Sequence, residues 1–64
     1  MAAKKSMLQR EKELQLLLAT PAGRVELHDL SERYASAGGR VRPETASVVT
    51  YILVYERERG LIAG

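Results

Sequence analysis

The spacing of apolar residues predicts a helix near the start of the chain. Residues 6–19 are rich in good helix formers and contain neither Gly nor Pro. Their apolar positions recur at spacings of three, four and seven, which places them on one helical face: Met7, Leu14, Leu17 and Leu18. Ser6 is well placed to cap this helix. We expect Thr20-Pro21, with Gly23, to end it, because a residue before Pro disfavours helical geometry.

A short strand and a second helix are predicted next. Arg24–Leu27 alternates polar and apolar residues, as a half-buried strand does. From about Leu27 to Ala37 the pattern becomes helical, with an inner face made of Leu27, Leu30 and Tyr34. Gly38-Gly39 is expected to end this helix, because Gly readily adopts the left-handed conformation found just after a helix.

The third predicted helix begins at Pro43, which suits a first helical position because its missing N–H is not needed there. It continues from Glu44 to Arg59, and Gly60 caps it. Its apolar stripe consists of Val49, Ile52 and Leu53. Leu61–Ala63 is then a second short strand, able to pair with Arg24–Leu27.

Residues 47–55 leave two interpretations open. They are crowded with β-branched and aromatic side chains, which favour strands. The Pro-Glu start, the Glu-Arg-Glu-Arg-Gly end and the length between them favour a helix. We adopt the helix and keep the strand as the alternative.

Composition limits the chain to one small domain. It has 64 residues, of which 45% are hydrophobic, a share typical of globular proteins. We expect a flexible basic segment at residues 1–5 and a single domain at residues 6–64. Without Cys, disulfides cannot support so small a core, so self-association as a homodimer is one usual substitute. The apolar runs are too short to cross a bilayer, and no signal peptide is evident, which predicts a soluble, cytoplasmic protein with no membrane partner.

Two stretches resemble the winged helix-turn-helix family. Val25–Tyr34 is similar to the strand and second helix of that family, and Tyr55–Ile62 is similar to the end of its recognition helix and the start of its wing. The resemblance implies a mostly α, three-helix winged-helix-like domain with a short two-stranded β element. Two departures stand out: the turn at Ala37–Pro43 is longer than usual, and a second wing strand is missing after Gly64.

The resemblance implies binding to double-stranded DNA and a transcription-regulatory role. The third helix would enter the major groove, with Ser47, Thr50 and Tyr51 facing the bases. Arg, Asn and Gln are missing from the early part of this helix, which predicts weak sequence specificity. Basic residues outside the helix would hold phosphates: Arg40, Arg42, Lys4, Lys5 and Arg24. Net charge is only +2, so composition is compatible with nucleic-acid binding without requiring it.

The rival hypothesis is a protein-interaction or homo-oligomerising domain of the same fold with no nucleic-acid role. Apolar side chains also lie off the main stripe of the third helix, and a helix that is apolar nearly all round needs burial on more than one side. In so small a chain, another subunit or a partner protein could supply that second side. The candidate interface residues are Val48, Tyr51, Val54 and Tyr55.

The sequence contains no recognisable set of catalytic residues or metal ligands. His28 is the one histidine and no Cys accompanies it, so a metal site lacks its usual ligands. His28, Asp29 and Ser31 are too close along one helix to form a proton relay. Gly38-Gly39 lacks the glycine spacing and the Lys of a phosphate-binding loop. We therefore predict a non-enzyme without cofactor, metal or small-molecule substrate.

Overall fold

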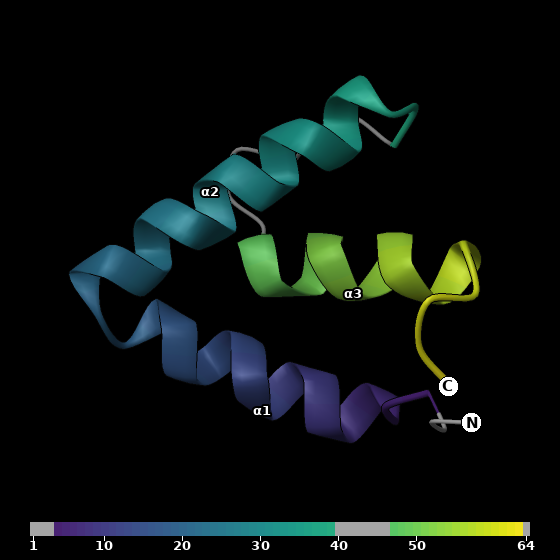
Figure 1. Ribbon diagram of the computed structural model, residues 1–64, viewed down its shortest axis with the longest axis horizontal. Helices are drawn as coiled ribbons and strands as arrows, with labels where there is room; N and C mark the ends of the chain where they lie inside the picture. The colour runs from purple at the N-terminus through teal and green to yellow at the C-terminus, as the bar shows by residue number, and fades with distance from the viewer. Residues whose placement is uncertain (1–3, 40–46, 64) are drawn as a thin grey trace.

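The computed structural model of the chain describes residues 4–39 and 47–63, which form three helices in the order α1, α2 and α3. α1 spans Met7–Leu18, α2 spans Pro21–Ser36 and α3 spans Val48–Glu58. Figure 1 shows α1 and α2 as the two arms of a V, with α3 between them and running in the same general direction as α2. Each pair of helices is in contact. The prediction of a mostly helical, three-helix domain is confirmed.

α1 begins at the predicted cap. The Ser6 hydroxyl accepts a hydrogen bond from the Gln9 backbone N–H at 3.1 Å, and the Gln9 side-chain oxygen accepts one from the Ser6 N–H at 3.3 Å. This reciprocal capping box satisfies two N–H groups that have no partner within the helix. The predicted inner face is also confirmed, because Leu14 is fully buried and the other apolar side chains of that face pack against the core.

Thr20-Pro21 starts α2 directly after α1, so the prediction that it would be followed by a strand is wrong. The Thr20 hydroxyl accepts a hydrogen bond from the Gly23 N–H at 3.0 Å, and Pro21 occupies the first turn. Gly23 lies inside α2 for a packing reason. A Cβ added there would lie only 2.0 Å from the Leu17 carbonyl oxygen, so Gly permits α1 and α2 to approach this closely.

The two-stranded β element is not seen among the described residues. Arg24–Leu27 is helical, because the cap at Thr20 places Leu27 on the same buried face as Gly23 and Ser31. Leu61–Ala63 does not pair with that segment either. Ala63 instead forms an isolated parallel bridge with Ser6, in which its N–H donates to the Lys5 oxygen at 2.9 Å.

Glycines end α2 and α3 as predicted. Gly38 has a φ of +93° and Gly60 a φ of +72°, a region in which a side chain is strained. After α2, the Gly39 N–H donates to the Tyr34 oxygen at 2.8 Å, and the Leu61 N–H makes the corresponding bond after α3. These bonds satisfy carbonyls at the helix ends.

Residues 48–55 are helical, so the helix interpretation of this segment is confirmed over its strand alternative. Ser47 caps α3, with its hydroxyl accepting from the Val49 N–H at 3.2 Å. The predicted start at Pro43 and Glu44 lies outside the described residues. Eleven residues separate the end of α2 from the start of α3. A tight helix-turn-helix connection is therefore absent, as the length of the turn had indicated.

α3 supplies most of the core. Among the described residues, four of its hydrophobic side chains are buried, and they pack with one buried side chain from α1, one from α2 and one from the C-terminal segment: Val49, Tyr51, Ile52, Leu53, Leu14, Leu27 and Ile62. Full burial of one such side chain stabilises a fold by about 1.5–3 kcal/mol. Because α3 lies between the other two helices, its broad apolar surface is buried largely within its own chain.

Candidate nucleic-acid interface

The start of α3 offers little surface for reading bases. Tyr51 is only 8% exposed and belongs to the core, so it does not face solvent as the predicted DNA contact requires. Ser47 is exposed, but its hydroxyl already caps the helix. Thr50 is exposed on the first turn. Of these three predicted base contacts, Thr50 alone combines exposure with a side chain that is not part of the cap.

The predicted subunit interface on α3 is largely occupied by the domain itself. Val48 is half-buried and packs against the core, and Tyr51 is buried within it. Tyr55 stacks on Tyr34, with ring centroids 3.9 Å apart and planes inclined by 13°. Val54 is half-buried. The apolar flank that indicated a second subunit is therefore mostly explained by packing against α1 and α2.

Basic residues from both ends of the described chain meet at one end of the molecule. The bridge between Ser6 and Ala63 ties the segment before α1 to the segment after α3, as Figure 1 shows. Lys4 is exposed, and its Nζ lies 3.7 Å from the position that a Cβ would take on Gly60. The last turn and C-cap of α3 add further exposed cations. We call this surface the basic end, made of Lys4, Lys5, Arg57 and Arg59.

Acidic groups only partly neutralise the basic end. Lys5 donates to Glu13 at 2.5 Å, and Arg10 donates to the same carboxylate at 3.2 Å. The hydrogen bond from Lys5 lowers the pKa of Glu13 most, and the hydrogen bond from Arg10 lowers it further. Glu58 lies between Arg57 and Arg59 in the sequence, and Glu11 is a further exposed carboxylate in the first half of α1. Glu56 is paired with Arg10, so that pair adds no net charge. The cations of the basic end are therefore partly offset.

The remaining predicted phosphate contacts lie elsewhere. Arg24 is exposed in the first turn of α2, at the opposite end of the molecule from Lys4 and Lys5. Along α3, Ser47 lies about 15 Å and Thr50 about 10 Å from Arg57 of the basic end, at 1.5 Å per residue. Arg40 and Arg42 lie outside the described residues. The structure thus places Lys4 and Lys5 at the same end of the molecule as Arg57 and Arg59, two arginines that the sequence had not indicated, and it does not join them to the start of α3. Within this end, Arg59 is directed to the Ala37 oxygen and Lys5 to Glu13.

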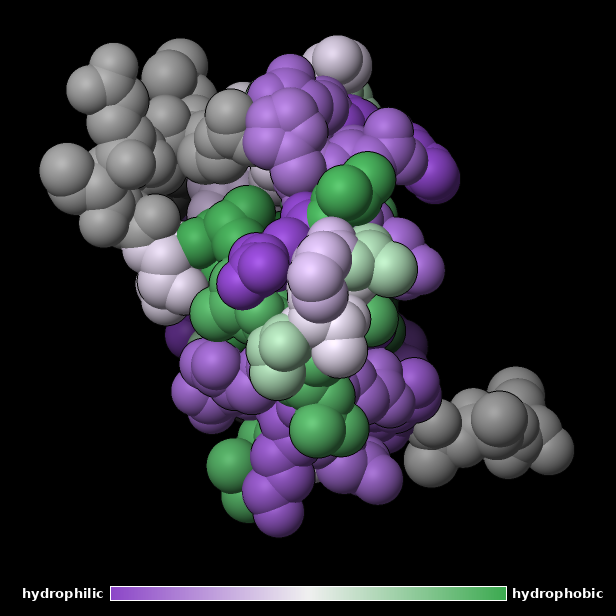
Figure 2. Space-filling view, turned by 90° about the vertical axis from the view of Figure 1, so that its left-hand side faces the viewer, coloured by the Kyte–Doolittle hydropathy of each residue, from purple (hydrophilic) through white to green (hydrophobic). Residues whose placement is uncertain are grey.

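Apolar side chains are exposed where α1 and α2 meet. Leu16 is 72% exposed near the end of α1, and Val25 is 70% exposed near the start of α2. Figure 2 views this face and shows hydrophobic side chains through its middle, between hydrophilic margins. We call this surface, defined by Leu16 and Val25, the apolar end.

A hydrogen-bonded triad of Arg10, Tyr34 and Glu56, with the buried Glu56 at its centre, joins the three helices. Glu56 of α3 is only 4% exposed and accepts two hydrogen bonds from Arg10 of α1, at 2.8 and 2.9 Å. It also accepts one from the Tyr34 hydroxyl of α2, at 2.6 Å. Burial and the bond to Glu56 raise the pKa of Tyr34, and the bond to Glu56 raises that of Arg10. Such a pair needs this geometry to offset the cost of desolvating both charges.

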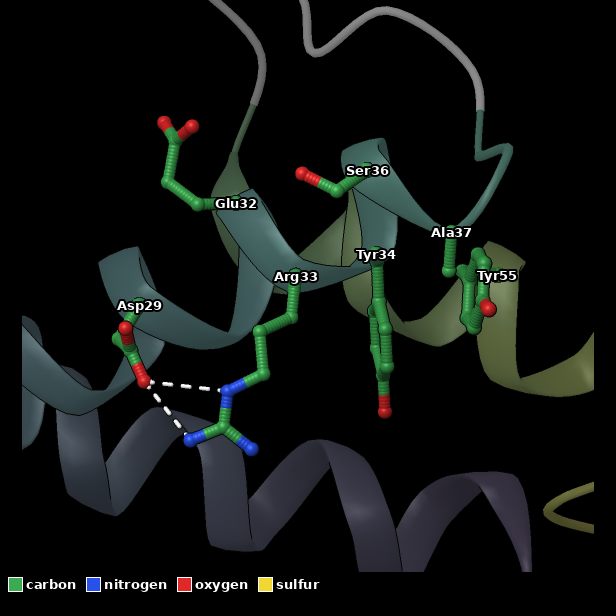
Figure 3. A pocket seen from close by; sticks show the side chains of 7 residues that line it. All are labelled: Asp29, Glu32, Arg33, Tyr34, Ser36, Ala37 and Tyr55. Carbon is green, nitrogen blue, oxygen red and sulfur yellow. Dashed lines mark hydrogen bonds and ion pairs between the residues drawn. The ribbon is translucent and has the colours of Figure 1, made fainter.

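The triad fixes one wall of an open groove of about 640 Å³. Figure 3 shows the Tyr34 ring edge-on, with Tyr55 on one side and the Arg33 side chain on the other. Arg33 donates to Asp29 at 2.8 and 3.2 Å. The Arg59 guanidinium lies over Tyr55, 5.1 Å from the ring centroid. We call this the aromatic groove, lined by Asp29, Glu32, Arg33, Tyr34, Ser36, Ala37 and Tyr55.

Within residues 4–39 and 47–63, no group of three or more acidic, His or Cys side chains is arranged to hold a metal ion. No helix in this part of the chain is long and apolar enough to cross a bilayer. Comparison with protein-family models, with curated proteins and with solved structures finds no match to the chain.

Proposed function

We propose that this chain is a small DNA-binding module that holds the phosphate backbone of the duplex with its basic end. The observation that carries the proposal is the meeting of Lys4 and Lys5 with the end of α3 that bears Arg57 and Arg59. Phosphate oxygens are bound by such exposed cations irrespective of base sequence. Each phosphate neutralised releases counterions, so a small basic surface is sufficient for salt-sensitive binding.

The proposed binding is weakly specific. Specificity for bases needs side chains that reach the groove edges, above all Arg, Asn or Gln. The first turns of α3 carry none of these, and Tyr51 is buried. A regulatory role at defined sites would therefore depend on contacts beyond the described surface, whereas coating or compacting DNA would not.

The location of the site can be tested with charge-reversal pairs. The double variant Lys4→Glu with Arg57→Glu changes the basic end, and Lys12→Glu with Arg24→Glu makes the same charge change at exposed positions away from it. Fluorescence anisotropy of a short labelled duplex measures the affinity of each double variant for DNA. We expect the first pair to weaken binding by about tenfold or more and the second pair to have a much smaller effect. Equal losses, or no binding by the unaltered chain, would contradict the proposal.

The second candidate function is a protein-interaction or homo-oligomerising domain, favoured by the exposure of Leu16 and Val25 at the apolar end. Large apolar side chains exposed on the same face of a small domain can form a docking site for another protein. Two large side chains bury far less than the roughly 800 Å² per partner of a stable interface, so self-association here would be weak. Sedimentation over a wide concentration range tests this. If the chain forms a concentration-dependent oligomer that is lost in Leu16→Ser and kept in Leu8→Ser, the result would favour the interaction domain over DNA binding.

A further inference from the structure

The aromatic groove contains an ordered stack with one open position. Arg59 covers the outer face of Tyr55, and the other face of Tyr55 stacks on Tyr34. Beyond Tyr34 comes the open groove, and Arg33 stands on its far side (Figure 3). A planar ring stacked on the Tyr34 face that is turned to the groove would extend this stack. Figure 3 shows the Tyr34 ring edge-on and the Arg33 guanidinium face-on, so the N–H edge of Arg33 would lie beside such a ring.

This site is organised before any ligand arrives. The Tyr34 ring is held by the hydrogen bond from its hydroxyl to Glu56, and Glu56 is held in turn by Arg10. Arg59 is restrained by its hydrogen bond to the Ala37 oxygen at 3.5 Å. On the other side of the groove, Asp29 orients Arg33. The Tyr34 ring is therefore the fixed part of the site, and little of its side-chain freedom remains to be lost on binding. Arg33 and Asp29 form an exposed pair at the margin of the groove.

We infer that the aromatic groove binds a nucleobase of a single-stranded nucleic acid, stacked on Tyr34 beside the Arg33 guanidinium. The inference rests on the proposed function and deepens it. Arg59 belongs to the basic end and also covers Tyr55, so the two surfaces are continuous. A strand whose phosphates lie on the basic end can therefore turn one base into the groove. Paired bases inside a duplex cannot reach it, whereas bases of a single strand stack readily on aromatic side chains.

The charges around the groove suit a base and not a phosphate. Its lining carries two carboxylates, Asp29 and Glu32, and one cation, Arg33, which is paired with Asp29. The groove therefore offers a phosphate no unpaired cation. Carboxylates accept hydrogen bonds from exocyclic amino groups, as Asp and Glu do from cytosine. Adenine, cytosine and guanine carry such an amino group and thymine carries none. We therefore expect an oligonucleotide of deoxyadenosine to bind more tightly than one of deoxythymidine.

The test compares single-stranded, abasic and duplex oligonucleotides by fluorescence anisotropy. Arg33→Ala removes one side of the site at a highly exposed position, and Arg24→Ala removes the same charge from the same helix outside the groove. We expect Arg33→Ala to weaken binding of the deoxyadenosine strand by about tenfold, as loss of one stacked base does, and to leave duplex binding nearly unchanged. Arg24→Ala should change neither. The unaltered chain should bind an abasic strand as weakly as the Arg33→Ala variant binds the intact one.

The ring itself is tested with two substitutions of Tyr34. Tyr34→Phe keeps the stacking surface, and Tyr34→Leu removes it. Circular dichroism of each variant shows whether the domain remains folded. If Tyr34→Phe still binds the single strand, and Tyr34→Leu is folded but no longer binds it, the result would support the stacked base.

Three outcomes would overturn the inference. The first is an unchanged affinity of Arg33→Ala for the single strand, and the second is equal binding of abasic and intact strands. The third is that a peptide with aromatic side chains binds the groove and an intact single strand does not, which would assign the groove to a protein partner. If the basic-end variant loses duplex binding while Arg33→Ala changes no affinity, the proposed function stands and the groove inference alone fails.

Discussion

Replacing Glu56 is expected to unfold much of the protein. Glu56→Ala leaves the Arg10 guanidinium, whose side chain is 21% exposed, without its main partner, and it leaves the Tyr34 hydroxyl without an acceptor. Removing one member of a buried ion pair costs about 3–5 kcal/mol. Arg10 keeps its hydrogen bond to Glu13 and some contact with water. We therefore expect a loss at the lower end of that range, about 3 kcal/mol of the free energy of unfolding.

That loss is large for so small a domain. A single core in a chain of this size rarely supplies more than about 3–5 kcal/mol. Glu56→Gln keeps one accepting oxygen, but it replaces the other with an NH2 donor that faces a donor of Arg10 or Tyr34. It should cost about 1–3 kcal/mol, less than Glu56→Ala. Replacing both partners with apolar residues, Arg10→Met with Glu56→Leu, leaves no unpaired charge and should cost much less than Glu56→Ala.

Urea denaturation followed by circular dichroism measures these differences. Glu11→Gln is the matched control, because Glu11 is an exposed carboxylate on α1, and it should change the free energy of unfolding by less than about 0.5 kcal/mol. The predicted order of stability is unaltered chain, Glu56→Gln, then Glu56→Ala. A loss below about 1 kcal/mol for Glu56→Ala would refute the reasoning that the triad joins the three helices.

Three further predictions concern packing and pH. Gly23→Ala should cost about 1–3 kcal/mol in urea denaturation, because its Cβ would overlap the Leu17 carbonyl, whereas Ala22→Ser, at an exposed neighbour, should be nearly neutral. Ile52→Ala should cost about 2–5 kcal/mol, since Ile52 is fully buried, and a smaller loss would place it outside the core. The raised pKa of Tyr34 means that its contribution is complete below the unfolded tyrosine pKa of about 10 and is lost as pH rises further. Melting temperature should therefore fall more steeply above that pH in the unaltered chain than in Tyr34→Phe, and parallel curves would contradict this.

Local signals in the sequence predicted the helices well. Ser6, Gly38 and Gly60 act where their conformational preferences placed them, because caps depend on a few neighbouring residues. Thr20-Pro21 ends the first helix as predicted, since α1 stops at Leu18, but it also begins the next helix, which the sequence analysis did not anticipate. The short alternation at Arg24–Leu27 then looked like a strand, although the longer helical period from Gly23 to Tyr34 explains it better.

The candidate sites were harder to predict because they depend on tertiary contacts. The bridge between Ser6 and Ala63, which joins residues far apart in the sequence, creates the basic end, and no spacing rule anticipates it. Glu56 did leave a signal. It continues the apolar stripe of Val49, Ile52 and Leu53, and a carboxylate on a buried face indicates a buried partner. Which cation would pair with it depended on how α1 packs against α3.

The salt dependence of duplex binding tests the central claim most directly. If the four cations of the basic end contact phosphates, the logarithm of the association constant should fall with the logarithm of salt concentration with a slope of about −3 to −4. The Lys4→Glu, Arg57→Glu variant should show a clearly shallower slope, while Lys12→Glu, Arg24→Glu should keep most of it. A slope near zero, or a slope that the basic-end variant leaves unchanged, would contradict the account.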